Sequence, residues 1–468
     1  MASGVPSRAD FFTEQAHDVA YEGGAGGCVP VPLAYHVGNV LNAGSPLIFH
    51  LPHIDKAAIN FQASYLRFRI RIRTNAGAAI GNNPRPVYPT NGIAHTLWKN
   101  IELLANGVPT TNSYQPYSYK KIIEHLLTAD ESAAHMHKLW GYKKRVSPPG
   151  QGAPHAISRV DRDTQRGQPH FENDNPNLRN WTEFIMTPAL DLFSCATNIV
   201  SLPTVKWELR LTPHDPVHSL NWSVDWGANL AEPDNAGVAD SLADNYRIEI
   251  DVPEVTFHMR KEILTDSAYA AAMDVAKNSG GFMYNYTPTV IKTKTLQPQT
   301  MGVEMSDYSP RANPLMLAHT FVLHDAYNGA KRYNPYFFSP PETLAKFYNY
   351  FNGQVLGEQS PVNLANGAGR PHLYHNNMSA LGIDDQSKGL YFDQDQQDKG
   401  FWFKITTLAP SSDSPALAPK TSSGIHTYKV ELNGHAALPY TIITYIIYEQ
   451  AKIIINLDGT VTNTFSPQ

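Results

Sequence analysis

The stretch Tyr65-Leu-Arg-Phe-Arg-Ile-Arg-Ile-Arg73 alternates apolar and charged residues without a break. Successive side chains on a β-strand point to opposite faces, so this pattern predicts a strand with one buried face and one face toward water. Residues 205–211 and 246–252 repeat the alternation. Several such strands predict a sandwich, in which two sheets bury their apolar faces against each other. We therefore expect an all-β fold.

A hairpin and a helix follow the first strands. Residues 98–105 are typical of a strand, and it ends at Asn106-Gly107, a dipeptide that tolerates the positive φ angles of a type I′ turn. Residues 116–127 begin with a proline and carry an apolar stripe, as an amphipathic helix does. The stripe consists of Tyr119, Ile122, Ile123 and Leu126. We expect this helix to cover an open end of the sandwich, and a second helical stretch to follow at residues 130–140.

The length of the chain favours two sandwiches in tandem. Its 468 residues exceed one ordinary core, and all-β sandwiches often reach about 200–250 residues each. A helix predicted between Thr265 and Gly281 marks the join. We expect an N-terminal arm at residues 1–29, a first sandwich at 30–260 and a second at 261–468. Strands of the second are predicted at 315–323, 344–351, 400–405, 427–432, 442–448 and 452–457, with turns at Asn352-Gly353 and Asp458-Gly459, and long polar loops at 146–180 and 226–245.

The composition favours an assembly. Charged residues make up 17% of the chain, below the usual quarter, so we expect other subunits to cover much of the surface. The net charge is −5, without a basic tail that could neutralise phosphates, and we interpret Lys143-Lys-Arg145 as a solvated loop. Only Cys28 and Cys195 are present, which indicates a reducing compartment without a disulfide framework. No signal peptide is recognisable before Cys28, and the most apolar segment, residues 440–448, is too short to span a membrane.

Four arginines on one strand face allow two interpretations. Arg67, Arg69, Arg71 and Arg73 could follow the phosphates of a nucleic acid. They could equally form a solvated or inter-subunit sheet face that is paired with carboxylates on neighbouring strands. We favour the second interpretation, because the sequence shows no aromatic residues interleaved on that face.

The sequence does not predict catalytic, cofactor-binding or metal-binding residues. The histidine pairs lack the third and fourth ligands of a zinc site, and the acidic run lacks the glycine and terminal glutamate of a calcium loop. These candidates are His50 and His53, His135 and His137, His372 and His375, and Asp393, Asp395 and Asp398. Nucleophile elbows and phosphate-binding loops are not found in the sequence. The sequence does not decide whether a carboxylate pair for glycoside hydrolysis exists, because the distance between two such carboxylates depends on the tertiary structure.

Several groups of residues, taken in order, resemble the double jelly-roll major capsid proteins of Polinton-type and adintovirus-type elements, of the adenovirus hexon-like lineage. The resemblance covers most of the chain, although residues 360–400 match none of its elements. The groups are the apolar run 45–52 with the strand, turn and helix that follow it, Asp191-Leu-Phe193 before 201–207, the strand and its arginine-bearing exit at 246–260, the Asn-Pro-aromatic turn at 333–338, and the last hairpin at 442–457 with Asp458-Gly459.

This resemblance implies a structural protein of a virion. It implies two jelly-roll sandwiches in tandem with short covering helices and long loops, and a homotrimer whose six lobes approximate a hexagon in an icosahedral shell. It also implies a single jelly-roll vertex protein as a partner, no sequence-specific nucleic-acid binding, no cofactor and no enzymatic activity. Two alternatives remain on the same architecture: a two-domain jelly-roll protein that binds glycans, and a jelly-roll hydrolase.

Overall fold

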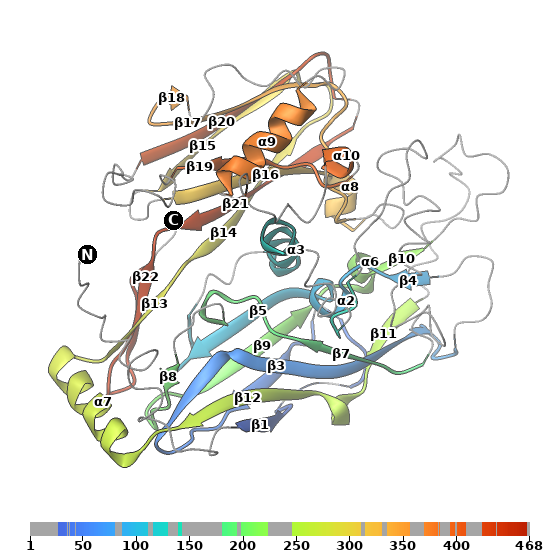
Figure 1. Ribbon diagram of the computed structural model, residues 1–468. Coiled ribbons are helices and arrows are strands. Elements are labelled where there is room, and N and C mark those ends of the chain that lie inside the picture. Colours follow the sequence, from blue (N-terminus) through green and yellow to red (C-terminus); the bar gives the residue numbers. More distant parts are fainter. Residues whose placement is uncertain are drawn as a thin grey trace.

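The computed structural model is built almost entirely from strands arranged in two stacked sandwiches (Figure 1). It describes residues 27–465, apart from 35, 37, 43, 80–86, 111–115, 130–138, 143–179, 194–197, 223–245, 310–313, 330–334, 356–368, 382, 384–393, 398–399, 409–423 and 437. The first sandwich, coloured blue to green, lies below the second, coloured orange to red (Figure 1). The predicted all-β class is confirmed.

Two antiparallel sheets form the first sandwich. One has the order β1-β12-β3-β11, with β7 and β8 also paired to β3, and the other has the order β2-β9-β5-β6. A short pair, β10-β4, lies beside them. The strands are β1 (Gly27–Pro32), β2 (Leu47–Leu51), β3 (Ala57–Thr74), β4 (Val87–Pro89), β5 (Trp98–Ala105), β6 (Val108–Pro109), β7 (Thr182–Met186), β8 (Ile199–Val200), β9 (Trp207–Pro213), β10 (Leu220–Trp222), β11 (Tyr246–Ile250) and β12 (Thr256–Ile263).

Strand β3 is the central strand of its sheet in the first sandwich, where it pairs with β12, β11, β7 and β8. Its sequence explains which of its faces is buried. Leu66, Phe68, Ile70 and Ile72 are fully buried, whereas the intervening arginines are half-buried. The buried faces of β3 and of β5 meet in the core, where the rings of Phe68 and Trp98 lie 5.8 Å apart, edge to face. The alternation read from the sequence therefore sets the sidedness of this sheet, as period-two patterning requires.

The second sandwich also has two four-stranded antiparallel sheets. Their orders are β14-β21-β16-β19 and β15-β20-β17-β18. Phe321 on β16 packs against Phe347 on β17, which joins the two sheets through the core. The strands are β14 (Thr289–Leu296), β15 (Gly302–Ser309), β16 (Pro314–Leu323), β17 (Leu344–Phe351), β18 (Gln354–Val355), β19 (Lys404–Thr407), β20 (Gly424–Leu432) and β21 (Tyr440–Tyr448).

A helix and a small sheet connect the sandwiches. Helix α7 (Asp266–Ser279) begins at Thr265, whose hydroxyl accepts a hydrogen bond from the Ala268 amide, and it ends at Gly280 with φ 77°. The chain then enters the sheet β13-β22-β23, made of β13 (Phe282–Tyr286), β22 (Ala451–Ile455) and β23 (Val461–Asn463). Strands β13 and β22 run along one side of the molecule between the sandwiches (Figure 1).

The helix predicted at 116–127 is α3 (Tyr117–Thr128), and its apolar stripe is buried as expected. Its predicted position was wrong. The helix lies between the two sandwiches instead of covering an open end of one (Figure 1). Tyr119 explains this placement, because its ring contacts Tyr327 and Tyr336 of the second sandwich at 5.2 and 5.1 Å between centroids. A helix with one apolar stripe thus joins two cores.

The remaining helices among the described residues are short. They are α2 (Ile93–Thr96), α6 (Pro216–Ser219), α8 (His324–Tyr327), α9 (Arg370–Ala380) and α10 (Gln394–Gln397), with 3-10 turns at Asp191–Phe193 and Val252–Glu254. Helices α9 and α10 occupy the region 360–400, for which the sequence suggested no element. In the part of the chain that the structure describes, every helix is too short or too polar to cross a membrane.

The structure changes one expected boundary, at residues 27–29, and leaves several other expectations untested. Residues 27–29, which we assigned to the arm, begin β1 and pair with β12. Cys28 is therefore an exposed strand residue opposite Arg260, with a free thiol. Outside the described residues lie segments 1–26 and 143–179, Cys195, most of the stretch predicted helical at 130–140 and the whole loop at 226–245. Those expectations stay predictions.

Candidate functional site

The arginine face of β3 is matched by carboxylates from neighbouring segments. Arg67 forms an ion pair of 2.6 Å with Glu183 on β7, and Arg69 lies 3.5 Å from Asp251. Arg71 forms an ion pair of 2.8 Å with Glu249 on β11. The interpretation of these three arginines as a face paired across strands is confirmed.

Glu249 is the centre of this network. Only 2% of its side chain is exposed, and it accepts hydrogen bonds from both Arg71 and Arg247. Burial alone would raise the pKa of the Glu249 carboxyl, but the hydrogen bonds and charges of the two arginines outweigh it and lower the pKa. Arg73, the last arginine of the row, lies directly opposite Arg247. Most of the positive charge on this face is therefore neutralised within the fold.

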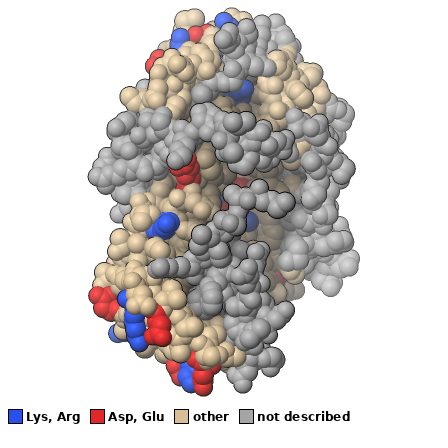
Figure 2. Space-filling model, turned by 60° about the vertical axis from the view of Figure 1, so that its left-hand side comes forward, with Lys and Arg blue, Asp and Glu red and all other residues tan. Residues whose placement is uncertain are grey.

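Aromatic side chains do occur on the arginine face, contrary to our expectation. The guanidinium of Arg71 lies 4.2 Å from the centre of the Trp181 ring, and Tyr65 stacks on His258 at 4.6 Å. Trp181 was missed because it comes from a distant segment that precedes β7. The view of Figure 2 shows Lys, Arg, Asp and Glu side by side at the lower end of the molecule, without a patch of one sign.

The two histidine pairs that the structure describes do not assemble into metal sites. His50 is exposed and lies 3.8 Å from Glu208, while His53 is bonded to the Ser201 hydroxyl at 3.0 Å. His372 and His375 are exposed on α9. His135, His137, Asp393 and Asp398 lie outside the described residues, as does the side chain of Asp395. Among the described residues, no three His, Cys, Asp or Glu side chains gather as metal ligands would.

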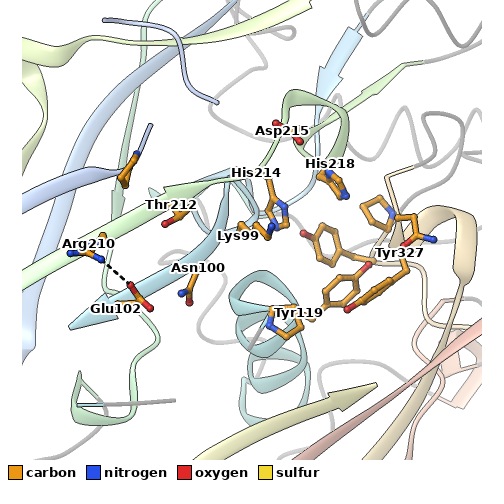
Figure 3. Close-up of a pocket in the computed structure, with 15 residues that line it drawn as sticks. Lys99, Asn100, Glu102, Tyr119, Arg210, Thr212, His214, Asp215, His218 and Tyr327 are labelled. Atoms are coloured by element: carbon orange, nitrogen blue, oxygen red, sulfur yellow. Dashed lines mark ion pairs between the residues drawn. The ribbon is translucent and has the colours of Figure 1, made fainter. Parts of the chain in front are cut away.

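A cleft of about 800 Å³ opens between the two sandwiches (Figure 3). Its floor is the outer face of β5 and β9, which pair so that Asn100 lies opposite Thr212 and Glu102 opposite Arg210. Helix α3 with Tyr119 forms one wall, the segment around α6 with His218 a second, and α8 with Tyr327 the roof (Figure 3). The lining residues are Pro46, Lys99, Asn100, Glu102, Pro116, Tyr119, Arg210, Thr212, His214, Asp215, His218, Tyr327, Asn328, Pro335 and Tyr336.

The histidines of the cleft are neutral at physiological pH. Burial, together with the nearby His218 and Lys99, lowers the pKa of His214 to about 3. Burial also lowers the pKa of His218, while the charge of Asp215 opposes the shift. The two rings stack at 4.9 Å, and His214 Nε2 is bonded to the Ser118 hydroxyl at 3.2 Å. The pair is part of the wall and not a source of positive charge.

A buried group of hydrogen-bonded polar side chains connects the two sandwiches near the cleft. The ammonium of Lys120 on α3 donates to the Asp191 carboxylate, and that carboxylate also accepts from the hydroxyl of Thr289 on β14, at 2.8 Å. Lys120, Asp191 and Thr289 are all less than 10% exposed. Sequence reasoning noticed Asp191 only as part of a motif, because nothing local shows that Lys120 and Thr289 meet it.

The cleft itself was not predicted from the sequence. Its residues come from separate segments between Pro46 and Tyr336, and no spacing connects them. One signal could have been read: Lys99, Glu102, Arg210 and Thr212 are polar residues on the outward positions of two central strands. An ordinary solvent-exposed sheet also has a polar outward face. This pattern alone therefore does not distinguish the floor of a cleft from a solvated sheet face.

Comparison with known proteins finds similarity in structure but not in sequence. Protein-family models and curated proteins give no significant match to the sequence. The mavirus major capsid protein is 11% identical, with a TM-score of 0.53 over 99% of this chain and 95% of that chain. The Faustovirus major capsid protein is 9% identical, with a TM-score of 0.55 over 92% and 90%.

A third structure covers the chain to a similar extent. PBCV-1 VP54, which was fitted into a reconstruction of the virophage Sputnik, is 9% identical, with a TM-score of 0.53 over 94% of this chain and 97% of that chain. All three matches run through both sandwiches, because each covers more than nine-tenths of this chain. The chain therefore has the fold of the double jelly-roll major capsid proteins.

Proposed function

We propose that this protein is a major capsid protein that forms the shell of an icosahedral DNA virus or virus-like element. The observation that carries the proposal is the extent of the structural likeness. It takes in 99% of this chain and 95% of the mavirus major capsid protein, so both sandwiches and their connection are shared. A site for glycan binding or hydrolysis would not by itself explain why both sandwiches match a major capsid protein.

We further propose a homotrimer as the building unit. Three copies of a two-sandwich chain present six similar lobes, and such a unit can tile a hexagonal lattice with closed symmetry. The low share of charged residues, 17%, agrees with a surface that is largely covered by other copies. The vertices of the shell would need a different partner, for which a single jelly-roll protein is our proposal. The protein is then located in the virion.

The finer assignments rest on the sequence. The ordered elements from residue 45 to Gly459 support a place in the Polinton and adintovirus type of this fold. The division at residues 1–29, 30–260 and 261–468 remains a proposal as well; the pairing of β12 through Ile263 and the position of α7 support a junction within a few residues of it. We also propose that the protein has no enzymatic activity, and that it binds duplex DNA weakly because the arginines of β3 are already paired with carboxylates.

The mass of the purified full-length chain in solution tests the proposal. Light scattering coupled to size exclusion should give three times 51.9 kDa and should stay constant on dilution, because obligate interfaces commonly bury about 2,000 Å² or more in total. Electron microscopy of the same sample should show six-lobed particles. A monomer at every concentration would contradict the capsid proposal, and a monomer that also binds immobilised glycans would favour the glycan-binding alternative.

A further inference from the structure

The N-terminus of helix α3 opens into the cleft without a capping side chain. The N-cap residue is Pro116, whose side chain makes no capping hydrogen bond, and the first turn contains no acidic residue. The first backbone amides of a helix point outward and carry a partial positive charge, which favours an anion. Pro116 and Tyr119 both line the cleft, so this end of the 12-residue helix faces it.

Tyr119 supplies an independent observation. Its side chain is 4% exposed, and its hydroxyl has no hydrogen-bond partner among the described residues. The buried hydroxyls of other tyrosines are used: Tyr117 accepts from the Ala189 amide and Tyr284 from the Val200 amide, each at 3.0 Å. A buried hydroxyl without a partner is costly, so Tyr119 is poised to donate to an acceptor in the cleft.

Two cations lie on the floor of the same cleft. Lys99 makes no ion pair with any described residue, and its charge is strong enough to lower the pKa values of His214 and His218. The Nε–H of Arg210 is buried without a partner, while its terminal nitrogens face Glu208 and Glu102 at 2.7 and 4.0 Å. Two carboxylates also line the cleft: Glu102, 4.0 Å from Arg210, and Asp215, beside His218. Lys99 is therefore the cation of the cleft that is left without an ion pair among the described residues.

We propose that this cleft binds a small organic molecule that carries a phosphate or carboxylate group. The oxyanion accepts hydrogen bonds at the N-terminus of α3 and from Tyr119, with Lys99 as its counter-charge. The organic part lies against Tyr327 in the roof (Figure 3) and against Tyr336, which also lines the cleft. A volume of about 800 Å³ fits this class, because ligand pockets generally measure about 300–1,000 Å³. The proposal is independent of the capsid function.

Titration calorimetry with phenyl phosphate and with benzoate tests the proposal and distinguishes the two anions. The purified full-length protein is used in whatever oligomeric state it adopts. At least one of the two probes should bind, and benzyl alcohol, which has the ring without the charge, should bind at least roughly tenfold more weakly, because hydrogen bonds to charged groups are the strong ones. Equal binding of benzyl alcohol, or no binding by either anion, would overturn the proposal.

Matched variants locate the site. Tyr119→Phe removes only the unpartnered hydroxyl and should weaken anion binding roughly tenfold, while the melting temperature stays unchanged. Tyr284→Phe makes the same chemical change outside the cleft; it should leave binding unchanged and lower the melting temperature, because the Val200 amide loses its acceptor. Lys99→Met should weaken anion binding, whereas Lys294→Met, an exposed change on β14, should not. Unchanged binding in both Tyr119→Phe and Lys99→Met would show that the anion binds elsewhere.

Discussion

A single carboxylate, Glu249, neutralises two arginines on the outer face of the first sandwich. Arg71 approaches it from the neighbouring strand β3 and Arg247 from its own strand β11, and its side chain is only 2% exposed. Removing one partner of a buried ion pair is strongly destabilising, because the remaining charges lose their compensation. The arginines are about a quarter exposed, so water screens part of that cost.

We expect Glu249→Gln to lower the free energy of unfolding by about 2 kcal/mol, because the amide keeps the shape but leaves two like charges side by side. Glu183→Gln is the control, since Glu183 pairs with Arg67 at a site that is 42% exposed, and it should cost less than about 1 kcal/mol. Chemical denaturation of both variants measures the difference. Equal small losses would show that the Glu249 network contributes little to stability.

Two buried histidines make the second sandwich sensitive to acid. His319 and His426 are 0% and 4% exposed, and their rings stack at 5.6 Å. His319 is bonded to the Thr444 hydroxyl, and the amide oxygen of Asn349 lies 3.4 Å from His426. Burial lowers the pKa of both imidazoles, that of His426 to about 4, with a further contribution from Lys292. Both rings are therefore neutral in the fold near pH 7.

The sign of the pH effect follows from these lowered pKa values. Below the usual pKa of 6.5 the unfolded chain binds protons that the folded chain does not bind. The contribution of His426 is complete above pH 6.5 and is lost as the pH falls toward about 4, at most about 3 kcal/mol. His426→Gln should flatten the stability profile between these values, as measured by denaturation at several pH values. A profile that keeps its slope would contradict this assignment.

At the scale of single elements, α3 is the most consequential segment. Leu126, which is 1% exposed, belongs to its buried stripe. Leu126→Asp would bury a charge without a partner and should cost several kcal/mol, seen as a large fall in the melting temperature or as insoluble protein. Val275→Asp on α7 is the control, because Val275 is 40% exposed, and it should leave the melting temperature nearly unchanged. A soluble Leu126→Asp variant with unchanged melting would show that this face of α3 is not core.

Two hairpin glycines allow two costs of a Gly→Ala substitution to be measured separately: backbone strain at positive φ and a steric clash of the added Cβ. Gly353 and Gly459 both have positive φ, 78° and 89°. A Cβ at Gly353 would meet nothing within 4 Å, whereas at Gly459 it would lie 2.5 Å from the Thr204 carbonyl oxygen. We expect Gly353→Ala to cost about 1 kcal/mol and Gly459→Ala clearly more, as measured by thermal unfolding. Equal losses would mean that the Gly459 turn can move away from Thr204.

Elements with local signals were predictable, and their tertiary neighbours were not. The alternation in β3, the turn at Asn106-Gly107 and the stripe of α3 follow from short-range rules, and the structure confirms them. Strands β13, β14 and β15 were missed, because the first follows a helix directly and the others mix polar residues into both faces. Helix α9, with a low share of apolar residues, gave no periodic signal either.

At the scale of the whole molecule, the junction between the sandwiches depends on Lys120. We expect Lys120→Met to cost about 3 kcal/mol or more, because Asp191 would stay buried without its cation. The double variant Lys120→Met, Asp191→Asn should recover part of the loss, since both charges are then gone. Thermal unfolding of the two variants measures this coupling. Additive losses in the double variant would show that the buried pair is not what joins the sandwiches.

The cleft and the junction could not be read from the sequence for the same physical reason. Each is assembled from residues far apart along the chain, as in the contact of Lys120 with Asp191 and Thr289. Charge and burial at such places depend on the tertiary fold, whereas sheet sidedness depends on neighbours two residues away. The predicted fold class was accordingly correct, while the position of α3 was wrong.

The C-terminal segment of the chain makes hydrogen bonds with the first sandwich. The Asn106 side chain donates to the carbonyls of Thr204 and Gly459, and Asn463 donates to the Thr110 carbonyl. Asn106 and Gly459 are separated by 353 residues, so at about 5–20 residues per second the ribosome delivers the second partner roughly 20–70 s after the first. During that interval the first sandwich lacks the contacts that the chain near Gly459 and Asn463 makes with it. Translation speed therefore sets how long this surface of the first sandwich is exposed to the cell.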